Sequence, residues 1–301
     1  MNNNATMIKQ EKIAAAVVLY HPDDTVINNI NSYIDQVDTV FAIDNTEQEH
    51  SSARPSKELY NNPKIVYITN QKNLGVAAAL NIGACNAIQS GYDFLLTMDQ
   101  DSKASPTMVA DLVTCATREN IKRIGILSPF HSTATDPFPP TDCVTQVLTA
   151  WTSGSLLNLK AYMGTGPFTE KLFIDFVDHE YGLRLNLAGY KIFKVNKAIL
   201  THNLGNNLKR HKFLWASPVV SNHSALRRYY ITRNRFYLAS QFKNNFPDFF
   251  REDLILFLKD LVVIFLFEKD IFHKYKMISR GFCDYKKGIF GEYQDICHQY
   301  R

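Results

Sequence analysis

A regular alternation of short apolar runs and amphipathic segments constrains the fold of this 301-residue chain more than any other feature. Residues 13–20 (IAAAVVLY) form an unbroken apolar run that ends at His21 and Pro22, which is typical of a strand buried on both faces of a sheet. Further runs predict strands at 39–45, 64–70, 93–99 and 123–129, and helical spacing predicts helices at 23–37, 76–91 and 108–120. This order indicates an α/β fold with a mostly parallel sheet flanked by helices.

Polar residues follow the ends of these predicted strands. Because the carboxyl ends of parallel strands lie at one edge of a sheet, where ligands bind, we expect these residues to gather in one site. They are Tyr20 and His21, Asp44 and Asn45, the run from Asn70 to Gly75, and Asp99 to Asp101.

Two aspartates, Asp99 and Asp101, stand at the end of the strand predicted at 93–99. Carboxylates at this spacing can bind one hard cation such as Mg²⁺ or Mn²⁺. A calcium-binding loop is excluded because Lys103 and Ala104 occupy its third-ligand and glycine positions. A phosphatase-type aspartate nucleophile is disfavoured by Lys103 and by the mid-chain location. A nucleotide-sugar metal site and a pair of exposed aspartates without a role both stay open from these residues alone.

Seven ordered blocks carry a resemblance to a known family. They are AAVVLYHPD, VFAIDNT, NLGVAAALNIG, FLLTMDQDS, TSGSLLNLKAY, LFIDFVDHEYGLRLNLAGYKI and THNLG, and they span about two-thirds of the chain. In these blocks the chain resembles the inverting family 2 glycosyltransferases of the GT-A fold, and among them bacterial rhamnosyltransferases of O-antigen and capsular polysaccharide synthesis. The resemblance implies a Rossmann-like nucleotide-sugar-binding domain at 1–205 and leaves 206–301 as a helical C-terminal extension.

The resemblance also implies a donor side and a metal site. Asp44 is expected to accept a hydrogen bond from the nucleobase. Asp101 and His202 are expected to hold a divalent metal, Mg²⁺ or Mn²⁺, which would neutralise the departing diphosphate. The residues expected to bind the donor are Tyr20, Asp44, Asn73, Gly75, Asp99 and Arg233.

An arginine-rich segment, RRYYITRNRFY, supplies the phosphate-binding candidates. Arg228, Arg233 and Arg235 are candidates because the guanidinium fork matches phosphate geometry. A similar segment in the rhamnosyltransferases favours Arg233, together with Tyr230 and Asn234. A solvated basic helix would have the same pattern.

The segment VDHEYGLRL supplies a catalytic base by resemblance. Alignment on Leu183 and Arg184 places Asp178 on the base and Glu180 on a second acid, while Val177 stands where glutamate is common. An inverting displacement needs one carboxylate to take the proton of the acceptor hydroxyl, whereas a retaining one needs a second carboxylate as nucleophile. We expect Glu180 to orient the acceptor or cap the helix. The acids could also merely stabilise the start of a helix. The residues expected on the acceptor side are Trp151, Ser153, Gly154 and Glu180.

These inferences predict one enzyme and leave alternatives. The predicted enzyme transfers a deoxyhexose, L-rhamnose from dTDP-β-L-rhamnose, to a sugar hydroxyl of a lipid-linked oligosaccharide in bacterial surface polysaccharide synthesis. The alternatives are an enzyme of the same fold with a UDP-sugar donor, a D-x-D phosphoryl-transfer enzyme and a non-catalytic sugar-binding protein. Nucleic acid is not expected as a partner, since RNA-recognition and helix-turn-helix motifs are absent.

The last third of the chain is basic. Residues 207–301 carry 17 Lys and Arg against nine Asp and Glu, whereas residues 1–206 carry 16 against 20. Residues 254–267 (LILFLKDLVVIFLF) predict a helix of about 21 Å, too short for the roughly 30 Å bilayer core. This helix could lie on an anionic membrane surface, pack on the catalytic body, or form a homo-oligomer contact.

Three further features bear on localisation. Residues 1–12 lack the apolar centre of a signal peptide, no apolar run has the length of a membrane span, and the five cysteines form no C-x-x-C pair. We therefore expect a cytoplasmic protein that could bind peripherally to the inner face of the plasma membrane.

Overall fold

A mixed sheet of nine strands forms the centre of the part of the chain that the computed structural model describes: residues 11–48, 57–118, 123–133, 138–202, 209–210 and 219–294. At 115–118, 202, 209–210 and 219 only the backbone is described. The strand order is β3-β2-β1-β4-β8-β6-β9-β5, and β7 pairs with β9. The strands are β1 Ile13–Leu19, β2 Thr39–Asp44, β3 Ile65–Thr69, β4 Phe94–Asp99, β5 Ser102–Ala104, β6 Ile124–Ser132, β7 Val144–Val147, β8 Ser155–Asn158 and β9 Lys191–His202, with a separate pair, β10 Lys209–Arg210 and β11 Val219–Val220.

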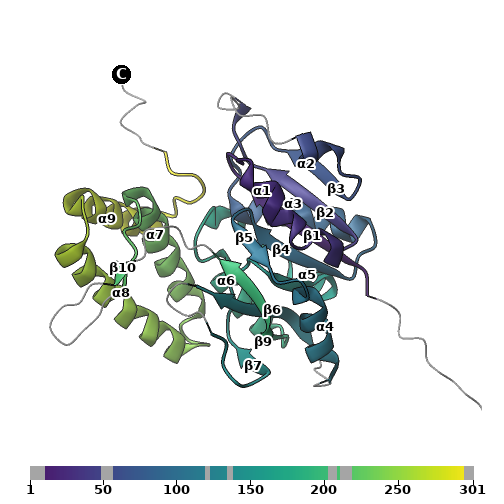
Figure 1. Cartoon of the computed structure of the whole chain (residues 1–301). Helices are drawn as coiled ribbons and strands as arrows, with labels where there is room; N and C mark the ends of the chain where they lie inside the picture. Colours follow the sequence, from purple (N-terminus) through teal and green to yellow (C-terminus); the bar gives the residue numbers. More distant parts are fainter. Residues whose placement is uncertain are drawn as a thin grey trace, which may run out of the picture.

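Helices cover the sheet and form a group beside it. Figure 1 shows α7, α8 and α9 packed together at one side of the sheet domain. The helices are α1 Thr25–Asn31, α2 Lys57–Asn61, α3 Val76–Gln89, α4 Met108–Arg118, α5 Leu159–Thr165, α6 Val177–Leu187, α7 Ala225–Phe242, α8 Pro247–Phe267 and α9 Ile271–Lys287. Within the described helices, none combines the length and the apolar character of a membrane span.

The first four strands confirm the predicted parallel sheet. β1 pairs in parallel with β2 and β4, and β2 pairs in parallel with β3. β8 lies antiparallel between β4 and β6, and β5 and β7 run antiparallel to β9. These antiparallel strands have three or four residues each, which is too short for an apolar pattern to predict.

Strand β1 shows why both faces of the sheet are buried. Ala15, Val17 and Leu19 pack with apolar residues of α1 and α4 on one face, and Ala14 and Ala16 pack with α3 on the other. Successive side chains of a strand point to opposite faces, so an unbroken apolar run is required. The carboxyl edge of the sheet is therefore where its polar residues can reach a ligand.

Helix α7 and the start of α8 pack on the sheet domain. Leu238, Phe242 and Phe250 belong to the same buried cluster as Leu172 and Tyr181. The C-terminal helices therefore share a core with the segment that leads into α6. The predicted boundary between 205 and 206 lies outside the described residues and stays a prediction.

Candidate active site

Two strand ends beside β1 bring acidic side chains to one edge of the sheet. In the register, Leu19 of β1 pairs with Asp44 of β2, and Val18 pairs with Asp99 of β4. Asp101 follows as an exposed residue in the turn between β4 and β5. The prediction that these strand ends share one edge is confirmed for the three aspartates.

The acid that starts α6 lies at the same edge. Burial, followed by the charges of Asp101 and Asp178, raises the pKa of Asp99 to about 7, while Arg227 lowers it. Such effects fall with distance, so carboxylates that act together on Asp99 must lie near it. The fold therefore brings the D-x-D turn and the predicted base of α6 into one acidic cluster.

A small pocket adjoins Asp178. Its lining includes Thr97, Trp151, Thr152 and Asp178. The indole of Trp151 is 41% exposed and packs edge-on against the ring of His131, with 4.7 Å between the ring centroids. An exposed aromatic face beside a carboxylate is a surface on which a sugar ring can stack.

Arg227 is the arginine of α7 that reaches this cluster, and the sequence interpretation missed it. Its Nη2 lies 2.9 Å from Oδ1 of Asp175, a side chain that is 12% exposed. Burial holds the pKa of Asp175 above its usual range, although Arg227 lowers it. The signal was available in the spacing: Arg227, Tyr230 and Asn234 share one helix face at positions i, i+3 and i+7, and Arg228 lies off that face.

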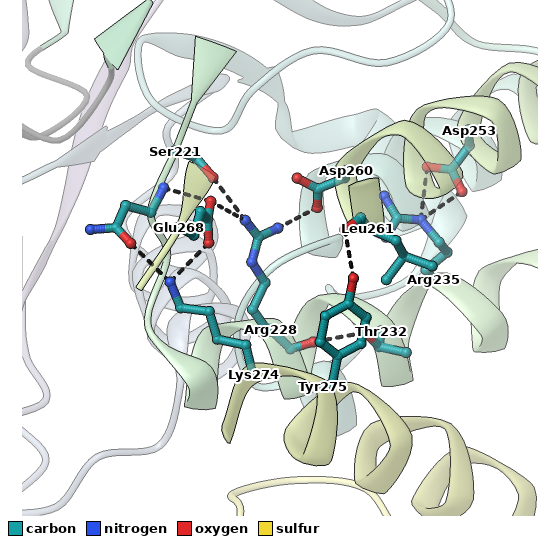
Figure 2. A network of polar contacts seen from close by, with 11 residues as sticks. Ser221, Arg228, Thr232, Arg235, Asp253, Asp260, Leu261, Glu268, Lys274 and Tyr275 are labelled. Carbon is teal, nitrogen blue, oxygen red and sulfur yellow. Dashed lines mark hydrogen bonds and ion pairs between the residues drawn. The ribbon is translucent and has the colours of Figure 1, made fainter. Parts of the chain in front are cut away.

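The predicted donor contact of Arg233 is contradicted by its burial. Arg233 is 0% exposed, and its guanidinium donates to the carbonyl oxygens of Leu172 at 3.0 Å and Gly291 at 2.7 Å. The other two candidates are also engaged: Arg228 lies in a buried network with Asp260 and Glu268 (Figure 2), and Arg235 pairs with Asp253. The sequence predicts a phosphate contact for Arg233 because its spacing does not show that this position of α7 is buried.

The remaining donor-side residues lie at the carboxyl edge. Asp44 is 5% exposed, and its carboxylate accepts hydrogen bonds from the Tyr67 hydroxyl and from the amide of Thr46 at 2.8 Å. Tyr20 is exposed, and its hydroxyl interacts with Asn73. The donor roles of Tyr20, Asp44 and Asn73 stay predictions. Tyr67, which was not among the predicted residues, holds the Asp44 carboxylate through its hydroxyl.

Gly75 is required for a close contact within the chain, and its donor role stays a prediction. Its φ is +81°, and a Cβ atom there would lie 2.5 Å from the carbonyl oxygen of Phe173. The next amide, that of Val76, donates to the same carbonyl at 2.7 Å. The start of α3 is thus joined directly to the segment that precedes α6.

Ser153 and Gly154 are buried and do not belong to the lining of the pocket, which corrects their predicted contact with an acceptor. Ser153 is 2% exposed, accepts from the amide of Asp99 at 3.1 Å and donates to Ser102 Oγ at 2.8 Å. Gly154 has a φ of +78°, and a Cβ there would lie 2.7 Å from Pro129 Cγ. Ser153 therefore holds the start of the D-x-D turn, while Gly154 lies close to Pro129 and Leu200.

Glu180 also faces inward. It is 2% exposed, and its Oε1 accepts from Arg184 Nε at 2.6 Å, one helical turn later. Arg184 donates in addition to the carbonyl of Pro167 at 2.7 Å. This burial contradicts the predicted acceptor-orienting role. Glu180 instead binds Arg184, which connects α6 to the preceding loop through Pro167.

The residues at the D-x-D turn suit a divalent cation. Ser102 pairs with His202 across β5 and β9, so the ladder places the backbone of His202 beside the residue that follows Asp101. The side chain of His202 lies outside the described part of the structure. No three described His, Cys, Asp or Glu side chains are grouped as a ready-made metal site. Carboxylate oxygens and an imidazole are nevertheless ligands that Mg²⁺ and Mn²⁺ accept, so this donor set fits the predicted metal.

Comparisons with known proteins relate the chain to glycosyltransferases. A family model described as "Glycosyl transferase family 2" matches residues 15–161, which include both aspartates of the D-x-D turn and Trp151. This part of the chain is similar to glycosyl transferase family 2 domains. Over 276 residues the chain is 25% identical to the dTDP-rhamnosyl transferase RfbF of Shigella flexneri, and the match covers 83% of this chain and 84% of that protein.

Solved structures support the fold described above. The crystal structure of GalNAc-T7 with UDP, GalNAc and Mn²⁺ matches 81% of the chain with a TM-score of 0.59 at 13% identity. The chain spans 50% of that structure's length. A second match is the crystal structure of S. aureus TarS, with a TM-score of 0.48 and 13% identity. It covers 90% of this chain and 43% of the TarS chain. The first match confirms the predicted GT-A-type architecture with C-terminal helices beside it.

Proposed function

We propose that this glycosyltransferase is a metal-dependent inverting rhamnosyltransferase. It transfers L-rhamnose from dTDP-β-L-rhamnose to a sugar hydroxyl of a lipid-linked oligosaccharide in bacterial surface polysaccharide synthesis. The observation that carries the proposal is the acidic cluster at the carboxyl edge of the sheet: Asp99 ends β4, and the charges of Asp101 and Asp178 both raise its pKa. This cluster supports a metal-binding turn and a base at one site. The choice of rhamnose and thymidine rests on the family resemblance and on the name of the Shigella relative.

Asp178 is suited to be the general base. Among the described residues that line the pocket beside Trp151, Asp178 is the one carboxylate. A base there can take the proton of an acceptor hydroxyl as the oxygen attacks the anomeric carbon. A retaining enzyme would need a second carboxylate about 5 Å away as nucleophile. The two other acids of this segment are engaged, since Asp175 pairs with Arg227 and Glu180 pairs with Arg184.

Arg227 and the D-x-D turn would act on the leaving group. A divalent cation held by Asp101, with Asp99 and His202, would neutralise negative charge on the departing nucleoside diphosphate. Arg227 is 49% exposed at its side chain and already interacts with Asp99 and Asp175, so it can turn its guanidinium toward a phosphate oxygen. We assign to Arg227 the diphosphate contact that the sequence interpretation gave to Arg233.

Helix α8 would bring the enzyme to its lipid-linked acceptor. Leu254, Leu258, Val262 and Phe265 form a stripe along α8 and are each 51–63% exposed. The surrounding C-terminal region has a surplus of eight positive charges. An apolar stripe within a basic surface matches an anionic membrane, where the helix would lie in the interface.

Turnover of nucleotide sugars tests the proposal. The full chain is incubated with dTDP-L-rhamnose, and separately with UDP-sugars, together with alkyl glycosides, in Mn²⁺ or in EDTA. We expect metal-dependent release of dTDP and a glycoside whose anomeric configuration, read by NMR, is inverted. A retained configuration would contradict the inverting mechanism. Preference for a UDP-sugar would contradict the proposed donor, and a phosphorylated aspartate in place of transfer would contradict glycosyl transfer itself.

A further inference from the structure

The segment 172–176 enters α6 through an unusual backbone path. Phe173 has φ 67° and ψ −65°, and the amide of Ile174 donates to the carbonyl of Leu172 at 2.8 Å, which is the rare and strained form of the γ-turn. Asp175 and Phe176 follow with φ of 60° and 64°. Three residues with side chains therefore occupy conformations that favour glycine, directly before the helix that carries Asp178. Such a path persists only where its surroundings hold it.

Helix α7 holds this segment through its backbone. Asn234 is 0% exposed, and its Nδ2 donates to the carbonyl oxygens of Leu172, Ile174 and Asp175 at 2.9, 2.8 and 2.9 Å. The amide has two hydrogens, which the three carbonyls share. The Oδ1 of Asn234 accepts from Arg233 Nε at 3.1 Å, so the amide is fixed in the orientation that presents its NH₂ group.

The same helix holds the segment at two further points. The ring of Tyr230 stacks on that of Phe173, with 5.4 Å between centroids. Arg227 forms its ion pair with Asp175. On the opposite side, the start of α3 binds the carbonyl of Phe173 through the amide of Val76. The segment is thus clamped between α3, beside the predicted donor residues, and the C-terminal helices.

We propose that Asn234 is a positioning residue for the general base Asp178: it holds the carbonyls of 172, 174 and 175, and so fixes the left-handed turn that directs the first turn of α6 toward the pocket. This inference rests on the proposed function for the role of Asp178. It makes α7 part of the catalytic unit. A displacement of the base by about 1 Å can lower the rate about a hundredfold. Loss of the hydrogen bonds from Asn234 should therefore lower kcat.

The test compares Asn234→Leu with Asn196→Leu. Leucine has nearly the shape of asparagine but cannot donate a hydrogen bond. Asn196 is a matched control because it is 2% exposed and its amide donates to the carbonyl of Asp142 at 2.6 Å, in β9 and away from the segment. Four quantities are measured on the full chains: kcat, KM for the donor, affinity for the nucleoside diphosphate, and hydrogen exchange of peptides within residues 170–181.

We expect Asn234→Leu to lower kcat by about tenfold to a hundredfold and to speed exchange in 170–181, with nucleotide affinity near that of the wild type. Asn196→Leu should keep kcat and the exchange rate of that segment. If Asn234→Leu does not fold, Asn234→Ala removes the same donors with less bulk. An unchanged kcat, or a loss equal to that of the control, would overturn the inference. If the wild type turns over no nucleotide sugar, the proposed function fails, and the exchange data still decide whether Asn234 holds the segment.

Discussion

The buried carboxylate of Glu268 accepts a hydrogen bond from Arg228 Nη2 at 2.8 Å, which ties the end of α8 to α7 (Figure 2). Its second oxygen accepts from Lys274 Nζ of α9, also at 2.8 Å. The side chains of all three residues are at most 4% exposed. One acid therefore neutralises two buried cations and joins the three C-terminal helices.

Glu268→Ala should destabilise the protein strongly. Removing one partner of a buried ion pair leaves uncompensated charge and costs about 3–5 kcal/mol, and here Arg228 and Lys274 would both lose a partner. Chemical denaturation measures the change in the free energy of unfolding. Asp248→Ala, which removes an exposed pair with Arg251, is the control and should cost about 0–1 kcal/mol. Equal effects of the two variants would show that the network contributes little.

His223 should make stability depend on pH. Burial, with the charges of Arg227 and Arg228, lowers the pKa of His223 to about 4. The unfolded chain, whose histidine keeps a pKa near 6.5, binds more protons between these values, so stability is full above about 6.5 and falls as the pH drops toward 4. Unfolding of wild type and His223→Gln at pH 7 and pH 5 checks this: the variant should lose less stability on acidification. His273→Gln, on the exposed side of α9, should follow the wild type.

Asp178→Asn should separate catalysis from binding. An amide cannot accept the acceptor's proton, so kcat should fall by about a hundredfold to ten-thousandfold, while the affinity for the nucleotide stays near that of the wild type. Steady-state kinetics and calorimetric titration with the nucleoside diphosphate measure the two quantities. Turnover at the wild-type rate would remove Asp178 as the base.

Asp101→Ala should abolish the effect of metal on donor binding. In the wild type, nucleotide affinity should be higher with Mn²⁺ than with EDTA, because a cation held by Asp101 would neutralise charge on the diphosphate. The variant should bind equally weakly in both conditions. Lys103→Ala, an exposed change two residues away, should keep the metal effect. A metal effect that survives in Asp101→Ala would place the ion elsewhere.

The paired change Leu258→Asp with Phe265→Asp should release the enzyme from membranes. Both side chains are exposed on the α8 stripe, at 54% and 63%, so the fold should tolerate the change while the apolar contact is lost. Flotation with vesicles that contain anionic lipid measures binding, and a change at exposed Met163 serves as control. Removing the chain after about residue 206 is not a suitable test of membrane binding, because it would also remove Leu238 and Phe242 from the core. Equal flotation of wild type and variant would exclude this surface as the membrane contact.

The sequence predicted the parallel half of the sheet and the acids at its edge because both depend on local patterns. Strand β1 reads as an apolar run, and Asp44 and Asp99 are the last residues of strands. The arginines show the limit. The spacing groups Arg227 with Tyr230 and Asn234, but the sequence does not show that Arg228 and Arg233 are buried while Arg227 stays exposed near the acids. The path of Phe173 to Phe176 could not be predicted, because left-handed residues without glycine depend on distant partners such as Asn234.

The ladder between β5 and β9 has a consequence for redesign of the proposed metal site. Ser102 is paired with His202, so the turn that holds Asp101 and the end of β9 are aligned by three residue pairs. One residue inserted within 102–104 would shift this alignment by one step, about 3.3 Å, and reverse which face each following side chain occupies. Engineers who wish to alter ion preference should therefore exchange side chains on the existing ladder and confine changes of length to the loop after Ala104.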